Sequence, residues 1–189
     1  MQRNEQENPS LKIIAVIVLV AMVTRITGPS FGNNFAPMNA IALFSGAYFV
    51  SPLVAVAVPL LSIVIGDYAV NYLYAGDFSP LYPGWYWQYV SYVLLACLGM
   101  LLRNRVRPLN VLGTTFAGAV LFFAISNFGV WLSAGLYPPT WDGLVTCFAL
   151  AIPFFKNTVY GDLFFVTLMF GACELFQRLS VPSRRPAAV

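Results

Sequence analysis

The sequence contains no histidine, which excludes a Ser-His-Asp triad, the common zinc protease motifs and imidazole ligation of haem. Its three cysteines, Cys97, Cys147 and Cys173, lie in separate apolar runs without paired spacing, so we expect them to pack as small hydrophobic side chains. A glycine-rich phosphate loop of the Walker type is also missing. We therefore expect no enzyme, no metal and no bound cofactor, and any ATP hydrolysis must come from another polypeptide.

Charged residues are also scarce, since they make up 9% of the 189 residues while 59% are hydrophobic. No soluble domain of this size covers such a composition with a surface that water tolerates. Six apolar runs are close to the roughly 20 residues that a helix needs to cross a bilayer. The sequence therefore predicts an all-α membrane protein with six transmembrane helices in a single integral-membrane domain, residues 1–189. The predicted spans are residues 11–26, 35–50, 52–74, 85–102, 111–132 and 158–179.

A seventh apolar run, residues 143–155, is only about half as long as a membrane-spanning helix. It contains Pro153 close to its end, and proline interrupts the hydrogen-bond ladder of a helix. The run therefore predicts a short re-entrant or interfacial helix that does not cross the membrane.

The positions of the basic residues predict the orientation of the chain. With six spans and a cytoplasmic N-terminus, eight of the ten basic residues lie inside, and only Arg25 and Lys156 lie outside. The first run has no small-residue cleavage site after it, so we expect it to be retained. The charges thus predict that both tails, residues 1–10 and 180–189, are cytoplasmic.

Polar side chains inside or beside the predicted spans gather toward the outer end. Because ionisable groups are costly in hydrocarbon, we expect these side chains to face one another and to form a substrate-binding site. The predicted site residues are Arg25, Asn34, Asn39, Asp67, Asn71, Asn127, Trp131, Lys156 and Asp162.

Several of these residues have a structural interpretation as well. Asp67 and Asn71 are four residues apart and share a helical face, where they either hold a polar solute or tie two helices together. Asp162 falls in the first turn of the last predicted span, where its charge complements the helix dipole. We expect Lys156 or Arg25 to form an ion pair with Asp162.

Aromatic residues are dense at the same end, and an interfacial belt accounts for most of them. Trp131 lies about one turn from Asn127, and this spacing makes it the candidate for stacking on a flat heterocycle. Small residues within the runs, among them Gly46, Gly99 and Gly113, predict close approach of neighbouring helices.

Three segments carry a resemblance to a known family. They are residues 34–49, NFAPMNAIALFSGAYF, residues 126–131, SNFGVW, and residues 153–158, PFFKNT, followed by Gly161 and Asp162. They resemble a family of uncharacterised bacterial integral-membrane proteins, over about residues 25–175. That family is in turn remotely similar to the substrate-binding S-components of energy-coupling-factor vitamin transporters.

The second resemblance implies a six-helix protein of the bacterial inner membrane that captures a vitamin-like solute from outside. A transmembrane coupling subunit and paired ATPases would then drive its delivery inward. Many S-components carry an Ala-x-x-x-Ala motif in the first helix, whereas Ala15 and Ala21 here are six residues apart. Action without a coupling module therefore stays open.

Two functions are consistent with the sequence. The first is a membrane-embedded protein that binds or takes up a small vitamin-like or heterocyclic molecule, with the outer polar residues as its site. The alternative is a non-transporting assembly or interaction protein, in which the same residues only tie helices together. An intramembrane enzyme ranks below both because no pair of nucleophile and base is visible, and nothing points to nucleic acid.

Overall fold

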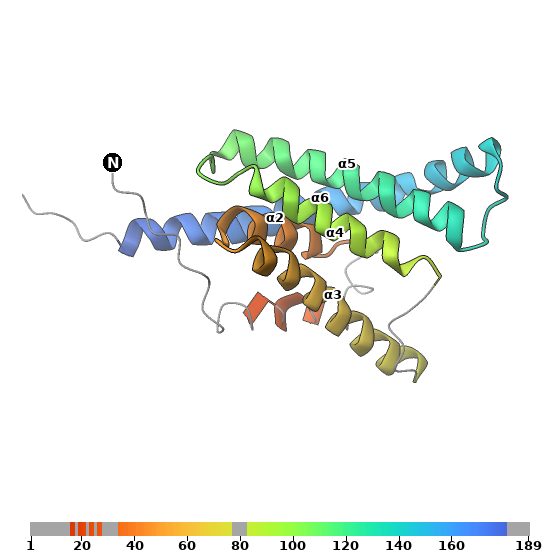
Figure 1. The fold of residues 1–189 in the computed structure, drawn as a ribbon, viewed down its shortest axis with the longest axis horizontal. Helices are drawn as coiled ribbons and strands as arrows, with labels where there is room; N and C mark the ends of the chain where they lie inside the picture. The colour runs from red at the N-terminus through yellow and green to blue at the C-terminus, as the bar shows by residue number, and fades with distance from the viewer. Residues whose placement is uncertain are drawn as a thin grey trace, which may run out of the picture.

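The computed structural model describes residues 16, 17, 19–21, 23, 24, 26, 27, 34–76 and 83–180, and within these residues it contains helices and no strand (Figure 1). The predicted all-α class is therefore confirmed. The predicted tails at residues 1–10 and beyond 180 lie outside the described residues. After the helical residues between 16 and 27, the helices are α2 (Met38–Tyr48), α3 (Pro52–Ala75), α4 (Trp85–Met100), α5 (Pro108–Ser133) and α6 (Trp141–Ser180).

Three of the described helices are long and apolar enough to cross a membrane, as expected of a membrane protein. They are α3, α5 and the Trp141–Leu175 part of α6. In contrast, α2 has 11 residues and α4 has 16, which gives lengths of about 16 Å and about 24 Å. Both are shorter than a hydrocarbon core of about 30 Å, so the six full spans are not confirmed.

The shortness of α2 has a local cause at each of its ends. Asn34 has a left-handed φ of 68°, and Pro37, which has no N–H donor, stands at the N-cap position without a side-chain cap. Phe49 is already extended, with ψ 129°, and Ser51 caps the next helix by accepting a hydrogen bond from the Val54 N–H. The apolar run at residues 35–50 therefore includes non-helical backbone at both ends.

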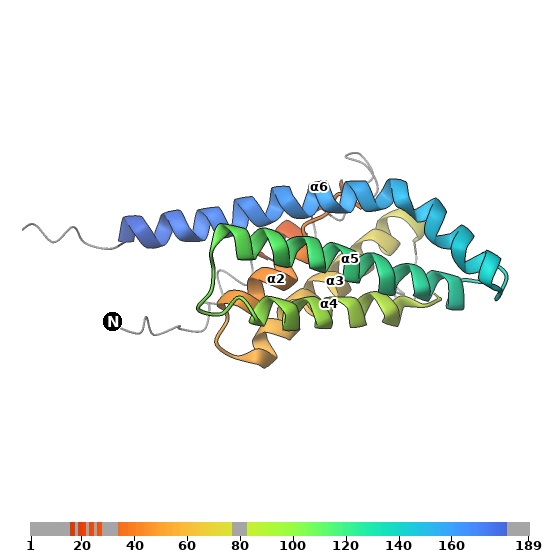
Figure 2. The ribbon, with the colours of Figure 1, turned by 90° about the horizontal axis from the view of Figure 1, so that it is seen from above.

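The prediction of a separate short helix at residues 143–155 is wrong, because α6 runs without a break through Pro153 for 40 residues. Phe148 and Phe155, on either side of the proline, both pack on the Phe123 ring of α5, at 5.5 and 4.8 Å between centroids. Proline bends a helix that its neighbours hold on both sides. Figure 2 shows α6 bending in its cyan part, beside the end of α5.

Helix α2 lies at the centre of the bundle and packs against α3, α4, α5 and α6. Nine of its eleven residues are buried. A Cβ on Gly46 would overlap the carbonyl oxygen of Ala96, and a Cβ on Gly99 would overlap that of Leu43. The predicted close approach is therefore confirmed for Gly46 and Gly99, while Gly113 has open space around it.

The connection between α4 and α5 contains three arginines and marks one end of the bundle. Arg103 donates from Nε to the Gly46 carbonyl at 3.0 Å and from Nη2 to the Phe49 carbonyl at 2.8 Å, which caps the C-terminus of α2. Arg105 and Arg107 are exposed in the same connection. We call this the arginine end.

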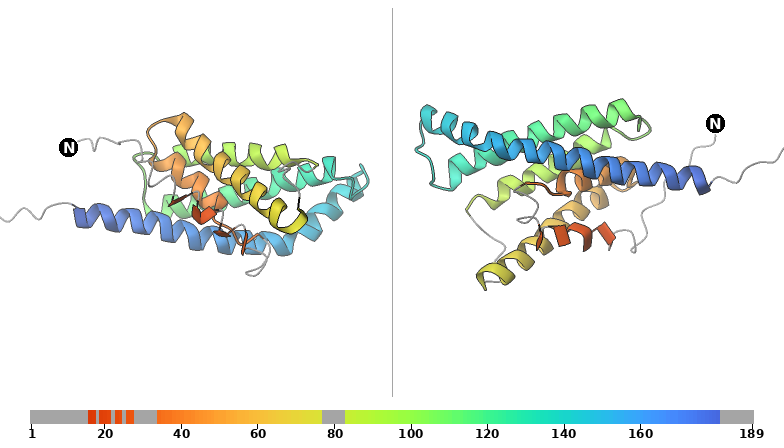
Figure 3. Two further views of the ribbon diagram at one scale, coloured as in Figure 1. Left: turned by 90° about the horizontal axis from the view of Figure 1, so that it is seen from below. Right: turned by 180° about the vertical axis from the view of Figure 1, so that it is seen from behind.

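The opposite end holds the last turns of α3 and α5 and the first turns of α4 and α6. There the Tyr74 hydroxyl donates to the Ile26 carbonyl at 3.1 Å, which joins α3 to the N-terminal helical residues. Helix α3 packs on α2 and α4 and diverges from α6 toward this end, as the right view of Figure 3 shows. The helices that remain together here are α4, α5 and the first half of α6.

Candidate functional site

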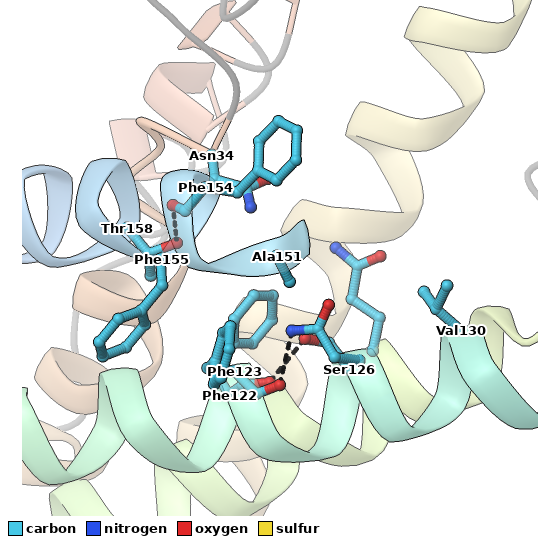
Figure 4. Close-up of a pocket in the computed structure, with 11 residues that line it drawn as sticks. Asn34, Phe122, Phe123, Ser126, Val130, Ala151, Phe154, Phe155 and Thr158 are labelled. Carbon is cyan, nitrogen blue, oxygen red and sulfur yellow. Dashed lines mark hydrogen bonds between the residues drawn. The ribbon is translucent and has the colours of Figure 1, made fainter. Parts of the chain in front are cut away.

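A cavity of about 200 Å³ lies between α4, α5 and α6, and Asn34 ahead of α2 completes its lining (Figure 4). Four phenyl rings provide most of the apolar wall, and three amides and two hydroxyls provide the polar groups. Apolar walls with a few convergent polar groups are typical of small-molecule sites. The lining residues are Asn34, Gln88, Phe122, Phe123, Ser126, Asn127, Val130, Ala151, Phe154, Phe155 and Thr158.

The lining follows from the periodicity of two facing helices. The residues that α5 contributes lie within about two turns, and those of α6 follow the spacing of one helical face. The α5 residues are Phe122, Phe123, Ser126, Asn127 and Val130, and the α6 residues are Ala151, Phe154, Phe155 and Thr158. The bend at Pro153 lies within this second stripe, so the cavity borders the part of α6 that was predicted to be a separate helix.

The two hydroxyl groups of the cavity donate their protons to backbone carbonyls of their own helices. Ser126 Oγ donates to the Phe122 carbonyl at 2.6 Å, and Thr158 Oγ1 donates to the Phe154 carbonyl at 3.1 Å. A hydroxyl that donates in this way still offers oxygen lone pairs as acceptors. These two groups therefore present acceptors to the cavity.

Asn127 behaves in the same way, since its Nδ2 donates to the Phe123 carbonyl at 2.7 Å. This bond uses one of the two N–H donors of the side-chain amide and fixes its orientation. The backbone carbonyl of Asn127 in turn accepts the thiol of Cys147 from α6 at 3.4 Å. Asn127 is thus held on both sides where α5 meets α6.

Asn34 reaches the cavity because the segment before α2 rests on α6. A Cβ on Gly161 would come within 3.2 Å of the Ala36 backbone nitrogen, so the glycine favours this close approach. The Phe35 ring packs on the Phe165 ring at 5.5 Å. Asn34 itself is exposed and adopts a left-handed conformation, which asparagine tolerates better than most residues.

Next to the cavity, Asn39 and Asp162 form a buried pair. Asn39 Nδ2 donates to Asp162 Oδ2 at 2.9 Å, and the side chains are 4% and 1% exposed. Asp162 is one turn beyond Thr158 on α6, so the pair lies along the same face as the cavity wall. It joins α2 to α6.

One prediction about Asp162 is wrong, and another is tested only for Lys156. It lies in the middle of α6, which begins at Trp141, so no helix N-terminus complements its charge. Lys156 does not pair with it, because Lys156 is exposed and six residues away on a different side of the helix. Arg25, the other expected partner, lies outside the described residues.

Asp67 is buried as well, but in a different contact. It is 3% exposed, and Oδ2 accepts a hydrogen bond from the Tyr89 hydroxyl at 3.5 Å, which links α3 to α4. Asn71 is half-buried one turn farther along α3. Neither residue lines the cavity between α4, α5 and α6.

The comparisons with known proteins concern nearly the whole chain. The sequence model of one family matches residues 5–184, which includes every helix from α2 to α6. The chain belongs to the DUF6580 family, a family of unknown function. No curated protein and no solved structure matches the chain. The predicted membership of a family without assigned function is confirmed, and nothing links DUF6580 to energy-coupling-factor S-components.

Of the residues predicted for the site, this DUF6580 protein brings Asn34 and Asn127 to the cavity and places Asn39 and Asp162 beside it. Trp131 does not line the cavity. Its Nε1 donates to the Pro138 carbonyl at 3.0 Å, which fastens the connection between α5 and α6.

Sequence reasoning missed most of the cavity wall. Phe122, Phe123 and Ser126 surround Asn127 on one face of α5, so extending the helical period from Asn127 would have found them. The same helical period could not be extended to Phe154 and Phe155 of α6, because the sequence predicts a separate short helix at residues 143–155. In this DUF6580 protein they belong to the wall through the continuity of α6.

Proposed function

We propose that the protein is a membrane-embedded binding protein that captures a small vitamin-like or heterocyclic molecule. The observation that carries this proposal is the cavity between α4, α5 and α6, where Asn34, Gln88 and Asn127 converge among phenyl rings. Polar groups within a membrane protein are costly and therefore mark functional sites. Three amides from three different segments around one cavity fit a binding site better than separate helix contacts do.

We further propose that the cavity opens toward the outer side of the bacterial inner membrane. Arg103, Arg105 and Arg107 lie at the arginine end, and the cavity residues lie toward the opposite end. The positive-inside rule assigns the arginine end to the cytoplasm. In this proposal both tails are cytoplasmic, and the solute enters from outside.

Uptake against a gradient, if ATP drives it, would need ATP hydrolysis by another polypeptide, since this sequence has no phosphate-binding loop of the Walker type. We propose that a separate transmembrane coupling subunit and ATPases provide it, as the resemblance to S-components implies. Uptake by proteoliposomes that contain this chain alone would show instead that the chain acts without a coupling module.

The binding proposal is tested by ligand-dependent stabilisation of the purified protein. A ligand that binds only the folded state raises the apparent melting temperature by an amount that depends on its concentration relative to Kd. Asn127→Ala is expected to abolish the stabilisation that a ligand gives to the wild type. Asn110→Ala is the matched control, because Asn110 lies on the same helix, is exposed, and uses Nδ2 only to reach the Arg105 carbonyl.

A non-transporting assembly protein is the second candidate. The observation that favours it is the use of Asp162 and Asp67 in contacts between helices, with Asn39 and Tyr89 as partners. This candidate predicts that no small molecule stabilises the protein and that Asn127→Ala leaves nutrient-limited growth unchanged. A stabilising ligand whose effect depends on Asn127 excludes it as a complete account.

A further inference from the structure

The part of the cavity wall that the described residues form is uncharged. Among its eleven lining residues the polar ones are amides and hydroxyls, and Asp162, one turn beyond Thr158, is paired with Asn39 and does not line the cavity. A charged ligand entering this space would lose its water without gaining a counter-charge from the described wall. Such a loss is expensive within a membrane protein.

The volume favours a ligand of about one ring. An engineered apolar cavity of about 150 Å³ in another protein admits benzene, whereas pockets for drug-sized molecules hold about 300–1,000 Å³. The cavity of about 200 Å³ lies just above the first of these values. Its size is therefore closer to that of one aromatic ring with a small substituent than to that of a drug-sized molecule.

The polar groups of the wall include both acceptors and donors, since three of them are amides. Ser126 and Thr158 have used their hydroxyl protons on helix carbonyls, and Asn127 has used one amide N–H in the same way. The oxygens of these three side chains are left to accept hydrogen bonds. A complementary ligand must offer N–H or O–H groups to these three oxygens, because an acceptor facing another acceptor gains no bond. The amides of Asn34 and Gln88 also carry N–H donors, so the wall suits a ligand that accepts hydrogen bonds as well.

From these three properties we infer that the cavity selects an uncharged, single-ring molecule that both donates and accepts hydrogen bonds, such as an aromatic primary amide. The inference rests on the proposed function and specifies its substrate class. Phenyl rings at Phe122, Phe123, Phe154 and Phe155 would contact the faces and edges of the ligand ring. Ser126, Asn127 and Thr158 would accept its donors.

Three probes of nearly equal size separate the properties in one experiment. Nicotinamide is neutral and donates hydrogen bonds, methyl nicotinate is neutral without an N–H donor, and nicotinate is an anion. Benzamide, methyl benzoate and benzoate repeat the comparison without the ring nitrogen, and naphthalene carboxamide tests size. Kd for each probe is measured by calorimetry on the whole protein in lipid nanodiscs.

We expect the amides to bind most tightly, the esters about tenfold more weakly because wall acceptors stay unpaired, and the acids about a hundredfold more weakly because of their charge. The naphthalene amide should bind more weakly than benzamide. Ser126→Ala should weaken the amides and leave the esters unchanged, while Asn110→Ala changes neither. Alanine at position 126 removes one acceptor from an otherwise helical position, so it should leave the fold intact.

The inference is overturned if an acid or an ester binds as tightly as its amide, if the naphthalene amide binds as tightly as benzamide, or if no amide binds at millimolar concentration. A separate screen against charged and larger vitamins then shows whether only this inference has failed or the proposed binding function has failed as well. Binding of such a vitamin that is lost in Asn127→Ala removes the inference and keeps the proposed function. The absence of any ligand removes both.

Discussion

Asn39 Nδ2 donates a 2.9 Å hydrogen bond to Asp162 Oδ2, and the bond joins two residues that are 123 positions apart in the chain. Both side chains are buried, one on the central helix α2 and the other in the middle of the long helix α6. The pair fixes these two helices against each other directly beside the cavity. Among the described residues, the partner of the Asp162 carboxyl group is therefore the neutral amide of Asn39 and not a lysine of α6.

Asn39→Leu should destabilise the protein, because leucine fills a similar volume but leaves a buried carboxyl oxygen without its donor. The expected loss is about 1–3 kcal/mol, and it is larger if Asp162 stays ionised. The measurement is the apparent melting temperature in detergent. Asp162→Asn retains an acceptor for Asn39 and should lose less stability, so equal stability of Asn39→Leu and the wild type would contradict the role of the pair.

Gly46→Ala should be strongly destabilising, because the new Cβ meets the Ala96 backbone, which has no flexible end that can move away. Forcing one methyl group into a packed contact of this kind costs about 1–3 kcal/mol. Gly113→Ala is the control from another helix, where nothing lies within 4 Å of the new Cβ. Thermal unfolding of both variants should show a loss for the first only, and similar losses for both would refute the close approach of α2 and α4.

Arg103→Ala should weaken the arginine end, since the helix α2 loses two donors to its terminal carbonyls at Gly46 and Phe49. We expect a loss of about 1–3 kcal/mol, which is typical for buried acceptors left unsatisfied. Arg105→Ala, an exposed neighbour with the same charge, should change stability by less than about 0.5 kcal/mol. If the two variants melt at the same temperature, Arg103 acts only through its charge.

Trp131→Phe should leave ligand affinity unchanged, although sequence spacing made Trp131 the candidate for stacking on a ligand. Its indole N–H donates to the Pro138 carbonyl and its ring packs on Phe128 at 5.5 Å, both outside the cavity wall. Phe154→Ala, in contrast, removes a ring from the wall and should weaken binding. Calorimetry with nicotinamide compares the affinities of the two variants. A loss of affinity in Trp131→Phe alone would indicate that the ligand binds at Trp131 and not against the α6 wall.

Composition was sufficient to predict an all-helical membrane protein, because the scarcity of charge and the lengths of the apolar runs are properties of the whole chain. The Gly46 and Gly99 contact was also predictable, since small residues in apolar helices indicate close packing. Hydropathy did not reveal that α2 is short, because Phe35, Ala36 and Pro37 are apolar in or out of a helix.

The continuity of α6 could not be predicted, because Pro153 bends or ends a helix depending on what packs beside it. Phe123 decides the outcome here by contacting rings on both sides of the proline, and Phe123 lies on another helix. The same long-range packing determines which polar residues meet. Asn127 and Asn34 line one cavity, whereas Asp67 accepts a hydrogen bond from Tyr89. The local spacing of these residues in the sequence does not distinguish a cavity residue from one that joins two helices.

The central claim is that the cavity between α4, α5 and α6 holds a small neutral aromatic amide, and native mass spectrometry tests it most directly. The purified wild type and the Asn110→Ala and Asn127→Ala variants are each incubated with nicotinamide and benzamide. Bound amide on the wild type and on Asn110→Ala, with none on Asn127→Ala, is the predicted result. Equal amounts of amide on all three proteins, or none on any of them, would contradict the claim.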